Sequence, residues 1–263
     1  MRIHEFGDKR NPVLLLLPGT ACFWKANFGQ VINLLAKDFF VAVVAYTGFD
    51  KLDTESYCSV TEETQKIEEY VNGHYGGSIH AAYGSSLGGS FVAHLVHRKK
   101  IHLKYGIIGS SDFDQMNAFN ATILTSLFVK LTYNFIHNGH YKTKFMQARF
   151  AQQMEDHNPY NKAFVSLVGA TNYDLSFISK ESLHNQFKSD LVTKLPTQID
   201  NKEASVHIFY AKKTGDKYLK RYKKYFKNPV IHSFNLRHEE LLGVYPKEWC
   251  VLIKEICLPN EKT

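Results

Sequence analysis

Residues 78–89 read SIHAAYGSSLGG, and this stretch decides how the rest of the chain is interpreted. The apolar run Ile79–Tyr83 leads directly into Gly84-Ser85-Ser86-Leu87-Gly88, and a helical pattern follows. Glycine stands two positions either side of Ser86, where a sharp strand-to-helix turn leaves no room for a Cβ atom. The bare G-x-S-x-G pattern occurs by chance in about one chain of this length in twenty. Its context must therefore carry the argument.

The remainder of the chain alternates short apolar runs with longer amphipathic ones, which is typical of a parallel sheet covered by helices. Runs such as Val13–Leu17 (VLLLL) suit strands that are buried on both faces. The pattern predicts a fold of the α/β class with a mostly parallel central sheet flanked by helices. The predicted strands are 13–17, 39–46, 79–83, 104–108, 206–210 and 230–234, and the predicted helices are 24–36, 61–72, 87–96, 215–226 and 246–256.

One interval interrupts the alternation. From Asp112 to about Ala204 no strand is apparent, and the sequence is helical in pattern and rich in aromatic residues. So long an interval between two sheet strands predicts an inserted helical cap rather than a loop. We therefore assign residues 1–111 and 205–263 to the core domain and residues 112–204 to the cap. Aromatic side chains dominate ligand pockets, so we expect some of the cap aromatics, with Phe128 and Phe135 as candidates, to line the pocket, while others form the core of the cap.

Composition limits the remaining possibilities. The 263 residues, 44% of them hydrophobic, are enough for one sizeable core. Four widely spaced cysteines without a C-x-x-C pair predict neither a zinc site nor a disulfide scaffold. The beginning of the sequence has no signal-peptide pattern, and the apolar stretch Ala121–Ile136 is interrupted by polar residues and too short to span a bilayer. We expect a soluble, cytoplasmic protein without stable membrane insertion, and the oligomeric state stays open.

The formal net charge of +7 raises the question of an anionic partner. Basic residues gather in the predicted helix 215–226, where Tyr218, Tyr222 and Phe226 fall on one face and the lysines mostly elsewhere. This spacing favours a solvated basic face above an aromatic core stripe, and we expect no nucleic acid partner. The alternative is a surface that attracts anionic substrates or lipid headgroups.

A serine hydroxyl is a poor nucleophile, so it needs a base within hydrogen-bond reach and a carboxylate that orients the base. Two residues fit by position: Asp216 follows the predicted strand 206–210, and His238 follows the predicted strand 230–234. The candidates then stand in the chain order Ser86, Asp216, His238. Asp216 could instead cap the helix that follows it, and Asp112 or Asp114 offers a carboxylate after the preceding strand.

These residues and their order resemble the α/β-hydrolase superfamily, whose nucleophile, acid and histidine lie on loops after successive strands. The resemblance covers nearly the whole chain outside the cap. It implies an oxyanion hole formed by the backbone N–H groups of Thr20 and Leu87. The sequence departs from the superfamily pattern at Pro18, where a histidine is usual, and at Arg237, where many members have glycine.

The resemblance implies a serine hydrolase that cleaves an ester or related acyl bond of a small, largely apolar substrate through an acyl-enzyme. No metal and no cofactor are implied. A thioesterase, an amidase or a carbon–carbon bond hydrolase would use the same residues, because the fold does not fix the reaction. A non-catalytic, hydrolase-like ligand-binding protein and a peripheral membrane-binding protein are the alternatives from other classes.

Overall fold

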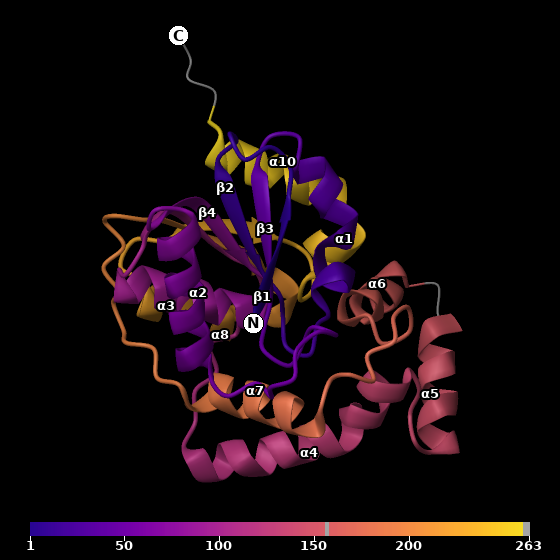
Figure 1. The fold of residues 1–263 in the computed structure, drawn as a ribbon. Coiled ribbons are helices and arrows are strands. Elements are labelled where there is room, and N and C mark those ends of the chain that lie inside the picture. Colours follow the sequence, from indigo (N-terminus) through magenta and orange to yellow (C-terminus); the bar gives the residue numbers. More distant parts are fainter. Residues whose placement is uncertain (156–157, 260–263) are drawn as a thin grey trace.

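The computed structural model describes residues 1–155 and 158–259 (Figure 1). The described strands form one seven-stranded sheet in the order β1-β3-β2-β4-β5-β6-β7. Every neighbouring pair is parallel except β1 with β3, which is antiparallel. The strands are β1 (Arg2–Phe6), β2 (Val13–Leu17), β3 (Phe40–Ala45), β4 (Ser78–Gly84), β5 (His102–Ile108), β6 (Ser205–Ala211) and β7 (Val230–Phe234).

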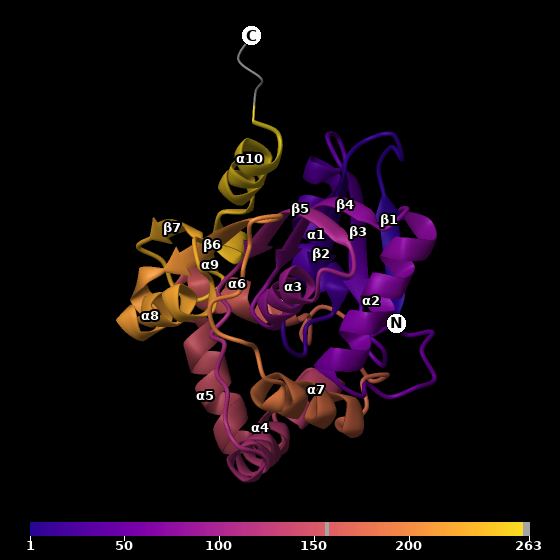
Figure 2. The same ribbon diagram turned by 90° about the vertical axis from the view of Figure 1, so that its left-hand side faces the viewer.

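Helices cover both faces of this sheet, as Figures 1 and 2 show. Leu14 and Leu16 of β2 pack in one apolar cluster with side chains of α1 and α10, while Leu15 and Leu17 pack in a second cluster with side chains of α2, α3 and α8. The alternation of β2 side chains therefore separates two cores, one on each face. The helices around the sheet are α1 (Trp24–Leu35), α2 (Val60–His74), α3 (Leu87–Arg98), α8 (Asp216–Tyr225), α9 (Glu240–Val244) and α10 (Pro246–Cys257).

The predicted α/β class is confirmed, and each predicted strand of the sheet lies within two residues of an observed one. Outside the insertion, three described elements were not predicted: the edge strand β1, the short helix α9 and the 3₁₀ helix Lys212–Thr214. The sequence of β1, RIHEF, mixes charged and apolar residues because this strand pairs only with β3 at the edge of the sheet. It therefore lacks the continuous apolar run that marks the central strands.

The interval between β5 and β6 is helical, as predicted, in the part that the structure describes. Its helices are α4 (Ala118–Asn138), α5 (Lys144–Glu155), α6 (Pro159–Val168) and α7 (Lys180–Val192). We call these helices and their connections the helical insertion. In Figure 1, α7 lies between α4 and the sheet, so α4 forms the outer layer of the insertion. The exact division of the chain into a core domain and a cap domain stays a prediction.

A polar stripe on α7 fixes the insertion to the core. The buried side chains of Ser182, Gln186 and Ser189 each accept a hydrogen bond from a backbone N–H of the core. Their spacing places them along one side of the helix. The donors are the N–H groups of Tyr57 at 3.0 Å, Ala21 at 2.8 Å and Val60 at 3.2 Å, in that order.

All four cysteines, which lie within the described residues, are free thiols. Within residues 1–155 and 158–259, no helix combines the length and the apolar character needed to cross a bilayer.

We predict that Ser189→Ala lowers the free energy of unfolding by about 1–3 kcal/mol, because Val60 N–H is left buried without an acceptor. The matched control is Ser126→Ala on the exposed face of α4, which should change stability by less than about 0.5 kcal/mol. Denaturant titrations of the two variants measure the difference. Equal stability of both variants would contradict the role of α7 in docking the insertion.

Candidate active site

Ser86 lies on the sharp turn between β4 and α3, with φ 48° and ψ −111°. A Cβ atom on Gly84 would overlap the carbonyl of Gly88, and one on Gly88 would overlap the carbonyl of Leu17. Both glycines are therefore required, as the sequence pattern indicated. A non-glycine residue in such a conformation costs about 1–3 kcal/mol, so the surrounding structure must hold it in place.

Glu239 provides that support. One carboxylate oxygen, Oε1, accepts hydrogen bonds from the backbone N–H groups of Ser86 and Ser110, both at 2.9 Å. The other oxygen, Oε2, accepts from the hydroxyl of Tyr83 at 3.3 Å, and the N–H of Glu239 donates to Ser110 Oγ at 3.0 Å. Glu239 is only 6% exposed. A single carboxylate thus joins the turn at Ser86, the loop after β5 and the segment before α9. Sequence reasoning missed this residue.

The environment of Glu239 also shows which nearby groups keep their protons. Burial raises the pKa of Tyr83 well above its usual range, and the negative charge of Glu239 adds to this effect. Burial likewise raises the pKa of the Cys22 thiol to about 12, again with a contribution from Glu239. At neutral pH Cys22 is therefore a thiol rather than a nucleophilic thiolate. The hydroxyl of Ser86 is the better candidate for the nucleophile.

His238 lies in the loop between β7 and α9, directly before Glu239. Its half-buried ring faces Phe164 of α6, with 6.1 Å between the ring centroids. Asp216 is the exposed first residue of α8, and its Oδ1 accepts from the Tyr210 hydroxyl at 3.4 Å.

The loops that carry the two residues are neighbours, since Lys213 N–H donates to the Leu236 carbonyl at 3.0 Å. Among the hydrogen bonds of the described residues, none joins Ser86, His238 and Asp216 to one another. Catalytic hydrogen bonds are often long or misaligned in unliganded enzymes. The triad therefore stays a prediction.

The alternative carboxylates have other partners. Asp112 Oδ1 accepts from the N–H of Asp114 at 3.0 Å, and Asp114 forms an ion pair with Arg221 of α8. Burial and then the charge of Asp112 raise the pKa of Asp190 on α7 to about 7. Asp112 thus lies in a group of acidic residues at the beginning of the insertion. These contacts favour Asp216 over Asp112 as the partner of the histidine.

The loop after β2 faces the turn at Ser86. A Cβ atom on Gly19 would lie 3.5 Å from the Cβ of Ser86. Gly19 N–H donates to Asn27 Oδ1 at 3.2 Å, and Ala21, which has φ 59°, donates to Gln186 Oε1 at 2.8 Å. Both neighbours of Thr20 are therefore held by buried side chains, Gln186 coming from the insertion.

Two backbone N–H groups remain available at this loop and turn. Among the described residues, no acceptor is found for the N–H of Thr20. Leu87 is the first residue of α3, so its N–H has no partner within the helix. Their role as oxyanion-hole donors stays a prediction.

Two of the candidate aromatic residues, Phe128 and Phe135, have ring partners within the insertion. Phe128 stacks on Phe187 with 4.1 Å between the centroids, and Phe135 stacks on Tyr141 at 4.7 Å. These two rings therefore contribute to the packing of the insertion, and which of its aromatic residues line an entrance stays a prediction. Phe164 is the aromatic residue that contacts His238.

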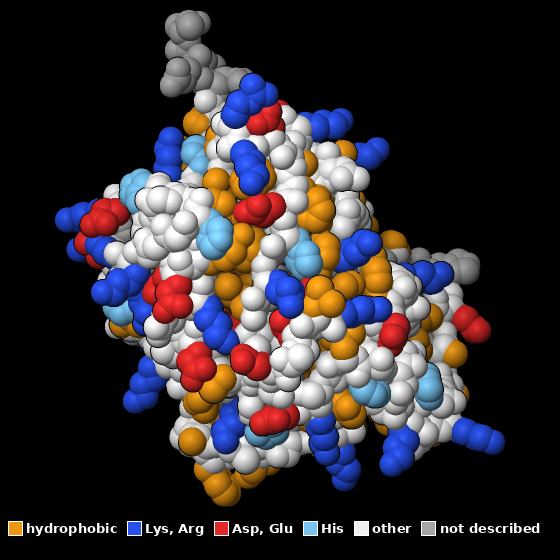
Figure 3. All heavy atoms as spheres, in the orientation of Figure 1, with side chains coloured by type: hydrophobic (Ala, Val, Ile, Leu, Met, Phe, Trp, Pro, Cys, Tyr) orange, Lys and Arg blue, Asp and Glu red, His pale blue; other side chains and the backbone are white. Residues whose placement is uncertain are grey.

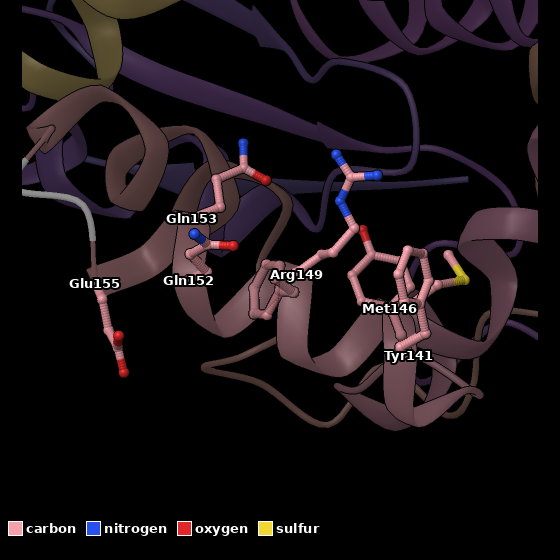
Figure 4. Close-up of a pocket in the computed structure, with 8 residues that line it drawn as sticks. Tyr141, Met146, Arg149, Gln152, Gln153 and Glu155 are labelled. Atoms are coloured by element: carbon pink, nitrogen blue, oxygen red, sulfur yellow. The ribbon is translucent and has the colours of Figure 1, made fainter.

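A cavity of about 910 Å³ lies beside α5 and not at Ser86. Figure 4 shows Tyr141, Met146 and Arg149 around it, together with polar side chains further along the helix. None of the predicted catalytic residues lines this cavity. A second cavity, behind Ser86 and lined by Tyr83, Ser110 and Glu239, has a volume of only about 10 Å³ and cannot admit a substrate.

No protein-family model matches the sequence, and no curated protein is detectably similar to it. Solved structures do resemble it. An α/β-hydrolase family protein from Desulfitobacterium hafniense is 21% identical, with a TM-score of 0.73 over 97% of this chain and 99% of its own. An esterase from a marine microorganism is 14% identical, with a TM-score of 0.71 over 97% and 98% of the two chains.

A third similar structure, 1H-3-hydroxy-4-oxoquinoline 2,4-dioxygenase, is 13% identical, with a TM-score of 0.64 over 97% of this chain and 95% of that one. The three structures share nearly the full length of this chain. The protein therefore has the α/β-hydrolase fold, as the sequence predicted. Because one of these enzymes is a dioxygenase, the fold does not by itself identify the reaction.

We predict that Glu239→Ala destabilises the protein by about 2–5 kcal/mol, because the N–H groups of Ser86 and Ser110 lose their common acceptor in a buried place. The folded fraction of Glu239→Ala should also have a lower kcat for any substrate, since Ser86 is no longer held in its strained conformation. Glu239→Gln keeps an oxygen acceptor and should recover most of the stability.

The control is Glu240→Ala, which removes a hydrogen bond to Arg237 N–H near the surface and should cost less than about 1 kcal/mol. Denaturant titration and steady-state kinetics of the three variants measure these effects. If Glu239→Ala behaves like Glu240→Ala in both measurements, the carboxylate does not support the turn at Ser86.

Proposed function

We propose that the protein is a serine hydrolase that cleaves an ester or related acyl bond of a small, largely apolar substrate. The observation that carries this proposal is the strained backbone of Ser86, with φ 48° and ψ −111°, on the turn between β4 and α3, where Glu239 accepts a hydrogen bond from its N–H. Such a turn exposes a serine hydroxyl at the end of a parallel sheet. The similarity to solved hydrolases and esterases supports the same conclusion.

In the proposed reaction, His238 takes the proton of the Ser86 hydroxyl as the oxygen attacks the acyl carbon. The negative charge that develops on the carbonyl oxygen is stabilised by the N–H groups of Thr20 and Leu87. Collapse of this intermediate expels the alcohol, which takes the proton from His238, and leaves an ester on Ser86. A water molecule, deprotonated by His238, then hydrolyses that ester and restores the enzyme.

The remaining residues have supporting roles in this scheme. Asp216 orients His238 after a small movement of its loop, and Phe164 gives the imidazole an apolar neighbour. Gln186 holds Ala21 in a left-handed conformation and so keeps the loop that contains Thr20 close to Ser86. The scheme needs neither a metal nor a cofactor, and a thioester, an amide or a carbon–carbon bond could be cleaved by the same groups. A cytoplasmic location stays a prediction.

We predict that a fluorophosphonate probe labels Ser86 covalently, because its hydroxyl is the one presented by the turn. Ser86→Ala should abolish labelling. Ser85→Ala, one residue away and also on the turn, should retain it, since Ser85 is 1% exposed. Intact-mass spectrometry measures the adduct. Labelling that persists in Ser86→Ala, or that never occurs in folded wild-type protein, would overturn the proposed function.

We predict that Asp216→Asn lowers kcat by orders of magnitude while the free energy of unfolding changes by less than about 1 kcal/mol, because His238 loses its orienting carboxylate. Asp112→Asn is the matched change and should leave kcat within about fivefold. The measurement is turnover of short-chain aryl esters, with circular dichroism to verify folding. A larger loss of kcat in Asp112→Asn would assign the acid to Asp112.

A further inference from the structure

The outer side of α4 exposes a row of large apolar side chains. Phe119, Ile123, Leu127 and Leu131 recur every four residues and are 74%, 55%, 52% and 45% exposed, and Leu124 beside them is 40% exposed. We call these five residues the α4 outer face. The opposite side of the helix is buried at residues such as Thr125 and packs toward α7. An apolar row of this kind is uncommon on a free surface and indicates an interaction site.

The chain segment that contains α4 carries formal charge of one sign. Residues 115–154 contain no aspartate or glutamate, although the chain has 25 of them in total. The same residues include four basic side chains, all exposed: Lys130 within α4, and Lys142, Lys144 and Arg149 shortly after it. Figure 3 shows hydrophobic and basic side chains together along the lower edge of the molecule, where α4 lies in Figure 1.

We propose that the α4 outer face is a docking surface for an anionic lipid bilayer. An apolar helix face accompanied by lysine and arginine inserts its apolar side chains at the acyl boundary while the cations contact the headgroups. A second copy of this chain is a poorer occupant, because residues 115–154 offer no acidic side chain that could pair with these cations across the contact. Within the described residues no helix can cross a bilayer, so the helix lies on the surface. This inference does not depend on the proposed hydrolase activity.

The matched test uses two exposed apolar positions at opposite ends of the molecule. Leu127 on α4 is 52% exposed, and Val251 on α10 is 54% exposed. Leu127→Glu places a negative charge in the proposed contact, whereas Val251→Glu makes the same change far from it. Both positions are at the surface, and circular dichroism should show that both variants fold as the wild type does.

The measurement is flotation with vesicles made of equal parts phosphatidylcholine and phosphatidylglycerol. The wild type and Val251→Glu should float with these vesicles, and Leu127→Glu should bind at least about fivefold more weakly. Lys130→Gln should weaken binding by about fivefold, because each basic residue near an anionic surface contributes about that factor. Vesicles of phosphatidylcholine alone, or high salt, should release the protein.

Three outcomes would overturn the proposal. The first is that the wild type does not float with anionic vesicles. The second is that Val251→Glu loses as much binding as Leu127→Glu, because the attraction is then a property of net charge alone. The third is that the wild type does not bind vesicles but forms dimers in sedimentation experiments, and that Leu127→Glu abolishes these dimers. The face would then be a contact between copies of the chain.

Discussion

The strained turn at Ser86 is the constraint on which the rest of the structure depends. Gly84 and Gly88 make the turn sterically possible, since a Cβ on either would overlap backbone atoms. The carboxylate of Glu239 makes it stable, because it binds the N–H of Ser86 and that of Ser110 through one oxygen. Segments from three distant parts of the chain therefore meet behind the proposed nucleophile. Glu239, the residue next to His238, accepts a hydrogen bond from the N–H of Ser86. The loop that contains the proposed base is therefore bonded directly to the turn that contains the proposed nucleophile.

The helical insertion takes part in the same arrangement. Its helix α7 presents three buried polar side chains to backbone N–H groups of the core, and Gln186 among them holds the loop next to Thr20. Movement of α7 would thus change the geometry of the proposed oxyanion hole. Among the hydrogen bonds of residues 1–155 and 158–259, none joins the outer helix α4 to the core in this way, and α4 exposes an apolar face instead. One layer of the insertion supports the proposed site, and the other faces the surroundings.

Much of this could be predicted from the sequence because central strands and the turn at Ser86 leave strong local signals. Apolar runs such as Val13–Leu17 identify buried strands, and the spacing of Gly84, Ser86 and Gly88 identifies the turn. Glu239 could not be found in this way, because its function depends on contacts with residues 129 and 153 positions away. The same reason explains why Phe164, and not Phe128 or Phe135, contacts His238. Ring packing between helices has no signature in a single sequence.

The most direct test of the account is to trap the acyl-enzyme that forms when the protein reacts with an ester substrate. The protein is mixed with a short-chain aryl ester, quenched in acid within the first turnover and digested for peptide mapping by mass spectrometry. The account predicts an acyl group on Ser86 when the acid quench precedes hydrolysis of the acyl-enzyme. Release of the alcohol without any acylated peptide, or an acyl group on Cys22 instead, would contradict it.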